Sequence, residues 1–179
     1  MNLREREDLH LLLLRDADVR QRMWLDRWEV SYPQVVTAQF AAANGLPEQS
    51  RQLQAAIDSA SAESPLFVVA HGAACAAFCA WLFDSSVLQQ KRIKGVMLVA
   101  PLFLQWQNDA ENTLQRARAS FPTAVVIGAD DAACKLEQAQ HIAAQLGGKA
   151  LQSPHTGHLD NDLFGWQWGM KLMQEMILA

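Results

Sequence analysis

The segment with the clearest chemical potential is Leu66–Ala77, where a short apolar run passes directly into a stretch of very small residues. A buried strand that enters a helix through so tight a turn has the geometry of a nucleophile elbow, which exposes its apex side chain. Such a turn needs small residues two before and two after its apex, and Ala70 and Ala74 meet that need around Gly72. Gly72 tolerates the strained backbone of an apex, but it brings no reactive side chain.

Cysteines supply further nucleophilic groups, at Cys75, Cys79 and Cys134. Their odd number and the lack of a CxxC pair argue against a disulfide framework and against a zinc knuckle. Cys75 lies one helical turn beyond Gly72, so we expect its thiol to point away from the apex. We interpret all three as buried free thiols, which pack as small hydrophobic side chains.

Residue types that bind metals gather in the segment His155-Thr-Gly-His158-Leu-Asp160. Two histidines three residues apart with a glycine between them do not form a helical pair of ligands. We therefore predict neither a metal site nor a cofactor. His71 directly precedes Gly72, and packing explains it better than catalysis.

Six short apolar runs predict the strands that must position these residues: Leu11–Leu14, Val35–Phe40, Leu66–Ala70, Val96–Ala100, Ala124–Gly128 and Lys149–Ser153. Most runs are continuously apolar, which is typical of parallel strands that are covered on both faces. Apolar residues at helical spacing predict helices at Glu48–Ala60, Ala133–Leu146 and Asn161–Leu178. The alternation predicts an α/β fold, with a mainly parallel sheet of about six strands and helices on both faces.

Length and composition indicate one ordinary globular domain over residues 1–179, with residues 1–8 as a loose N-terminal segment. The chain is 50% hydrophobic and 19% charged, with a net charge of −4. It has no basic surface signature for nucleic acid or an anionic membrane. Its N-terminal apolar run is too short for a signal peptide, and no run is long enough to span a bilayer. We expect a cytoplasmic protein.

The motifs around the elbow resemble, in order, those of the small serine hydrolases of the retinoblastoma-binding-protein-9 type, in the α/β-hydrolase superfamily. At the elbow those proteins read roughly V-A-H-S-L-G-C, where this chain has Val69-Ala-His-Gly-Ala-Ala-Cys75. The other similar segments are Trp24–Glu29, Lys94–Pro101, Gly128–Asp131, Gly157–Asn161 and the late Trp168. The resemblance covers nearly the whole chain and implies an α/β-hydrolase fold.

The chain departs from that family at two places that bear on chemistry. Gly72 stands where the family has its nucleophilic serine. The family also has a glycine-rich loop after its first strand that helps form the oxyanion hole. Here that stretch is Arg15–Arg20, which has no glycine or proline and carries acidic residues. The Ala73 backbone N–H remains as one expected oxyanion donor, and losing one donor typically costs ~10²–10³ in rate.

The resemblance implies that the acid and the base of a catalytic triad are both kept. Asp131 would be the acid and would hold His158, the base, in one tautomer. Asp130 is the alternative acid, although the second aspartate fits the family pattern better. With no nucleophile, this pair is either a relic held by loop packing or a device that orients a water molecule.

Two functional classes therefore stay open. The first is a catalytically defective family member, a pseudoenzyme, that binds an unidentified small molecule or protein partner. The second is an active hydrolase of small esters or amides that uses His158 and Asp131 with water or an unidentified nucleophile. Loss of both the serine and the glycine-rich loop favours the first class. An engineered Gly72 is a further alternative, but it leaves the Arg15–Arg20 loop unexplained.

Overall fold

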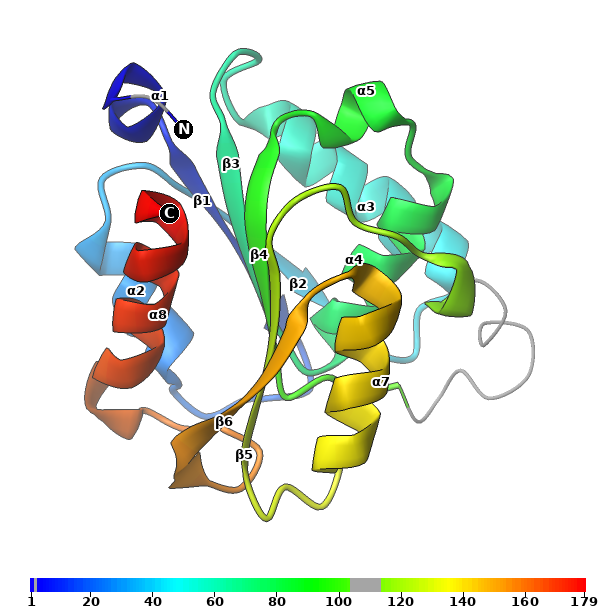
Figure 1. Cartoon of the computed structure of the whole chain (residues 1–179), viewed down its shortest axis with the longest axis vertical. Helices are drawn as coiled ribbons and strands as arrows, with labels where there is room; N and C mark the ends of the chain where they lie inside the picture. The colour runs from blue at the N-terminus through cyan, green and yellow to red at the C-terminus, as the bar shows by residue number, and fades with distance from the viewer. Residues whose placement is uncertain (2, 104–113) are drawn as a thin grey trace.

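The computed structural model describes residues 1, 3–103 and 114–179, which form a layered α/β structure (Figure 1). The strands are β1 (His10–Asp16), β2 (Val35–Phe40), β3 (Leu66–His71), β4 (Ile93–Val99), β5 (Thr123–Ala129) and β6 (Lys149–Thr156). The helices are α1 (Leu3–Glu7), α2 (Trp24–Ser31), α3 (Leu46–Ser59), α4 (Ala73–Asp84), α5 (Val87–Gln90), α7 (Leu136–Leu146) and α8 (Gln167–Leu178), with a 3₁₀ turn η1 (Leu163–Gly165) before α8.

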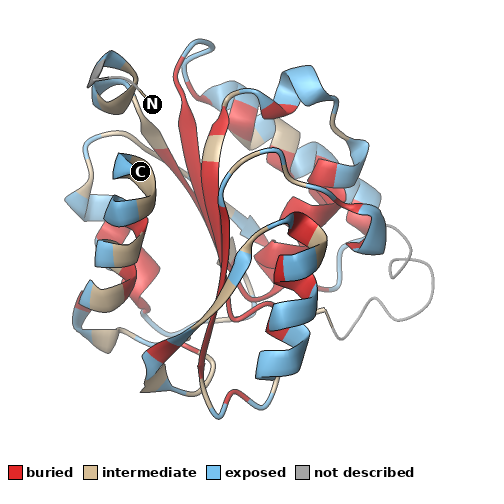
Figure 2. Ribbon diagram, in the orientation of Figure 1, coloured by how far each residue is buried: buried red, intermediate tan, exposed pale blue. Residues whose placement is uncertain are grey.

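These strands form one parallel sheet in the order β2-β1-β3-β4-β5-β6. This confirms the predicted six-stranded parallel sheet. The central strand β3 is buried along its whole length, which explains why its sequence is continuously apolar (Figure 2). From β1 the chain passes to β2 on one side of β1 and then to β3 on the other side. The order of connection therefore reverses between β1 and β3, which is where open α/β sheets usually bind ligands.

Helices cover both faces of the sheet, as predicted (Figure 1). On one face, α3, α4 and α7 pack against alternate residues of the strands and form one core. Leu53 of α3, Phe78 of α4 and Ala139 of α7 are buried in it. On the other face, α2 and α8 enclose a second core that is rich in tryptophan. Trp24, Trp28 and Trp166 are fully buried there. These tryptophan rings fix the segment that follows β6.

Two predicted helix starts were wrong. The helix predicted from Asn161 begins only at Gln167, because Leu163, Phe164 and Trp166 all have positive φ. Trp166 still packs in the core, so its apolar spacing looked helical although its backbone is not. The helix predicted from Ala133 begins at Leu136. Its predicted end at Leu146 is confirmed, and the left-handed Gly147, with φ 72°, caps it.

The N-terminus is more ordered than the loose segment that we expected. Residues Leu3–Glu7 form the short helix α1. Glu5 pairs with Lys94 at 3.3 Å, and Arg6 donates a hydrogen bond of 3.0 Å to the carbonyl oxygen of Leu178. The two ends of the chain therefore lie side by side (Figure 1).

Candidate functional site

The site is built at the carboxyl ends of the parallel strands, where β3 turns into α4. Gly72 is the single residue between the two elements, with φ 59° and ψ −123°. Its N–H donates to the Val99 carbonyl oxygen at 3.0 Å, which ties the turn to β4. Ala70 and Ala74 are fully buried on either side. The predicted strand-to-helix turn with a positive φ at Gly72 is confirmed.

Asp16 lies against this turn, because β1 is the neighbour of β3 in the sheet. Its Oδ2 accepts a hydrogen bond of 2.8 Å from the Ala73 N–H, the first of helix α4. Its Oδ1 accepts from the Asp18 N–H at 2.9 Å, and the residue is 2% exposed. The sequence left the Ala73 N–H as an expected oxyanion donor, whereas in the structure the carboxylate of Asp16 is its partner.

The Asp16 carboxylate also fills the space beside the apex. A Cβ atom built on Gly72 would overlap Asp16 Oδ2 and lie 3.1 Å from both Cβ and Cγ of Asp16. Any side chain at residue 72 therefore requires Asp16 to move. Sequence reasoning included Asp16 only as part of an acidic loop. The contact depends on β1 and β3 being neighbours, which local sequence does not reveal.

A carboxylate–imidazole pair lies at the carboxyl ends of β5 and β6. Asp131 follows β5, His158 follows β6, and the His158 Nδ1 lies 3.0 Å from Asp131 Oδ2. The other oxygen of Asp131 accepts from the Ala133 N–H at 2.8 Å, which orients the carboxylate. The Asp131 side chain is 1% exposed and the His158 side chain 21%, so the imidazole is partly open to solvent while the carboxylate is buried. Asp130, the alternative acid, is exposed with φ 57°.

Two glycines let the loops of this pair approach each other. A Cβ on Gly128 would overlap the carbonyl oxygen of Gly157, so only glycine fits at that crossing. The Gly157 N–H donates to the Ala129 carbonyl oxygen at 2.7 Å. The close approach brings Asp131 and His158 within hydrogen-bonding distance, as the resemblance implied.

Buried aromatic side chains bind the backbone of His158 and of the residue that follows it. His71 Nε2 lies 2.9 Å from the His158 carbonyl oxygen, and the Trp24 indole N–H donates to the Leu159 carbonyl oxygen at 2.8 Å. Burial lowers the pKa of His71 to about 4, so its ring is neutral at pH 7. A neutral ring must donate through Nε2 to that carbonyl, which leaves Nδ1 as a buried acceptor with no partner among the described residues. We interpreted His71 as packing, and the structure adds this hydrogen bond.

The remaining candidate groups make other contacts. Cys75 is fully buried, its Sγ lies 3.4 Å from the Ala70 carbonyl oxygen, and burial raises its pKa well above the ordinary value. A buried thiol of high pKa is inert as a nucleophile. His155 Nδ1 lies 3.2 Å from Ser153 Oγ. Within residues 1, 3–103 and 114–179, no group of three or more His, Cys, Asp or Glu side chains is arranged to hold a metal ion.

Comparison with known proteins agrees with this geometry, since the family model for serine hydrolases matches residues 17–175. The chain belongs to the serine hydrolase family. No curated protein matches its sequence. The described part of this family member contains no helix of the length and apolarity needed to cross a membrane.

Solved structures give the same fold at low sequence identity. A YdeN-like hydrolase from Pectobacterium atrosepticum is 20% identical with a TM-score of 0.76, over 97% of this chain and 93% of that one. Mouse alpha/beta hydrolase domain-containing protein 10 is 8% identical with a TM-score of 0.71, over 93% and 89%. Est1E from Butyrivibrio proteoclasticus is 12% identical with a TM-score of 0.68, over 96% and 88%. These structural similarities show that this serine hydrolase family member has an α/β-hydrolase fold.

Proposed function

We propose that this protein is a catalytically defective serine hydrolase of the retinoblastoma-binding-protein-9 type, with Gly72 in the place of the nucleophilic serine. The observation that carries the proposal is the position of Asp16, which occupies both the space for a side chain at residue 72 and the Ala73 N–H. The role of the protein is to bind a small molecule or a protein partner at this site. The three free, buried cysteines support a reducing, cytoplasmic location.

Covalent catalysis needs a nucleophile and a donor for the developing oxyanion. Gly72 supplies no nucleophile. The Ala73 N–H donates to a carboxylate, so a carbonyl oxygen must compete with Asp16 for it. A carboxylate at that position also repels negative charge that develops on the substrate. The two deficits reinforce each other, because the activity that survives loss of a nucleophile depends on an intact oxyanion hole.

The direct test is the reactivity of the unmodified protein. Fluorophosphonate probes label an activated hydroxyl, so we expect no labelling. We expect p-nitrophenyl acetate hydrolysis to be no faster than that of an unrelated protein with the same number of histidines. Labelling at a defined serine, located by peptide mass spectrometry, would contradict the proposal.

The preserved bond between His158 and Asp131 favours a second candidate. An oriented imidazole can act as a general base toward water, which would give a hydrolase of small esters or amides without a covalent intermediate. His158→Ala distinguishes the two, with His155→Ala as the matched control on the same segment. Turnover that His158→Ala abolishes and His155→Ala preserves would favour the hydrolase. Equal background rates in all three proteins would favour the pseudoenzyme.

A further inference from the structure

Strand β2 stands at one end of the strand order, with β1 as its neighbour in the sheet. The carbonyl oxygens of Gln34 and Phe40 accept hydrogen bonds of 2.9 and 3.0 Å from backbone N–H groups on the β1 side. Backbone groups of successive strand residues point to opposite sides. The N–H and C=O groups of Val35, Thr37 and Gln39 therefore point away from β1, along the outer edge of the sheet.

This edge lacks the features that usually keep edge strands apart. Proteins protect such edges with charged residues, prolines or bulges, because an open edge pairs readily with another chain. The opposite edge, β6, has all three: Lys149, Pro154 and a shift of register against β5. In contrast, β2 reads Val-Val-Thr-Ala-Gln-Phe, and its register with β1 is regular. Strand β2 is thus the unprotected edge of the sheet.

Helix α3 flanks this edge with side chains that admit a second copy of the chain. The Gln52 Nε2 donates to the outward carbonyl oxygen of Gln39 at 3.0 Å, so Gln52 marks the side of α3 next to the edge. Ala55 and Ser59 lie three and seven residues further on, which places them on the same side of the helix. All three side chains on this side of α3 are exposed and uncharged.

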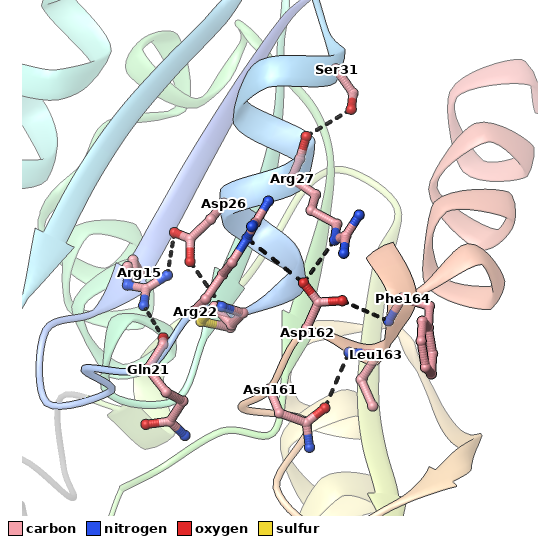
Figure 3. A network of polar contacts seen from close by, with 11 residues as sticks. Arg15, Gln21, Arg22, Asp26, Arg27, Ser31, Asn161, Asp162, Leu163 and Phe164 are labelled. Carbon is pink, nitrogen blue, oxygen red and sulfur yellow. Dashed lines mark hydrogen bonds and ion pairs between the residues drawn. The ribbon is translucent and has the colours of Figure 1, made fainter.

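The other face of β2 is equally free of unpaired charge near the edge. Val35 packs with the tryptophan-rich core, so the side chain of Thr37, two residues on, lies on that face and is exposed. Helix α2, which covers the same core, has Val30 82% exposed. Arg27, one turn before Val30, reaches away to Asp162 at 2.7 Å (Figure 3).

From this edge we infer that the protein forms a symmetric dimer, in which the β2 strands of two copies pair antiparallel and join the two sheets. A two-fold axis beside Thr37 pairs Thr37 with itself, and Val35 with Gln39 of the second copy. These are the residues whose groups point outward, so each outward N–H gains an acceptor. The Gln39 carbonyl oxygen has a second lone pair for the new bond beside that from Gln52. Strand β1 separates this edge from Gly72, so the dimer is independent of the proposed function.

Sedimentation velocity over a concentration series tests the dimer with charges at its axis. The wild-type mass should rise from 19.9 kDa toward twice that value as concentration increases. Thr37→Lys and Thr37→Glu should each stay monomeric, because like charges then lie opposite each other. An equimolar mixture of the two variants should recover the dimer, since opposite charges then pair. Gln152→Lys, at an exposed position of β6, should dimerise like the wild type.

A wild-type mass of 19.9 kDa at every concentration would overturn the inference. A dimer that survives both substitutions at Thr37 would also overturn it, as would a mixture of the two variants that stays monomeric. If the variants do not fold by circular dichroism, hydrogen exchange in the wild type tests the same pairing. The amides of Val35 and Thr37 should exchange more slowly at high than at low concentration, while that of Ala38, which faces β1, should not change. Equal behaviour of all three amides would refute the pairing.

Discussion

A serine at residue 72 gives the sharpest test of the arrangement around Asp16. Residue 72 has φ 59°, a region that costs a non-glycine residue roughly 1–3 kcal/mol. Its Cβ would also overlap Asp16 Oδ2, and overpacking of this kind typically costs about 1–3 kcal/mol. We therefore expect Gly72→Ser to lower the free energy of unfolding by roughly 2–6 kcal/mol.

A control separates the two contributions. Gly147 also has a positive φ, of 72°, but a Cβ there would meet nothing within 4 Å. Gly147→Ser should therefore show the backbone cost without the overlap. In urea denaturation, Gly72→Ser should be the less stable of the two by at least about 1–3 kcal/mol, because the overpacking adds to a ψ of −123° that costs a side chain more than the ψ of 23° at Gly147.

Combining Gly72→Ser with Asp16→Ala should relieve the overlap. The double variant should then be more stable than the sum of the single changes by about 1–3 kcal/mol, because the two residues are in contact. Fluorophosphonate labelling should appear in the double variant and not in Gly72→Ser alone, since only the former frees the Ala73 N–H. Additive stabilities, or full labelling of Gly72→Ser with Asp16 present, would refute the reasoning.

Three further outcomes follow from the structure. In the labelled double variant, Asp131→Asn should abolish labelling and Asp130→Asn should preserve it, as measured by gel fluorescence, because Asp131 contacts His158. The pKa of His71 falls from 6.5 unfolded to about 4 folded, so the unfolded state binds more protons between these values. Stability should fall as pH drops from 6.5 to 4, by up to about 3 kcal/mol, and His71→Gln should flatten that slope in urea titrations at each pH. Native Cys75 should resist iodoacetamide until the protein unfolds, as followed by mass spectrometry, since it is buried with a raised pKa; rapid native alkylation there would contradict its placement.

The fold was largely predictable because buried strands appear in the sequence as runs of apolar residues. Strand β3 is covered on both faces, so all six of its residues are buried and its run of apolar residues is unmistakable. The contact between Asp131 and His158 was predicted through the resemblance. The 3₁₀ turn before α8 was not predicted, because Trp166 has the spacing of a helical core residue while its backbone is left-handed.

The role of Asp16 could not be predicted from local sequence. The strand that we predicted ended at Leu14, since a charged residue normally marks the end of a buried strand. The observed β1 continues to Asp16, because the N–H groups of Ala73 and Asp18 satisfy its carboxylate. One of these donors is 57 residues away, on an element that becomes a neighbour only when the sheet forms.

The contact between Asp16 and Gly72 makes these two residues energetically interdependent. With glycine at 72 and no acceptor at 16, the buried Ala73 N–H would lose its partner, at a cost of about 1–3 kcal/mol. With a side chain at 72 and aspartate at 16, the overlap would cost a similar amount. Only two combinations avoid both costs: glycine with Asp16, or a side chain at 72 with an open loop whose donor binds substrate or water. A reactive side chain at residue 72 therefore requires changes at both residues, and either change alone lowers the free energy of unfolding.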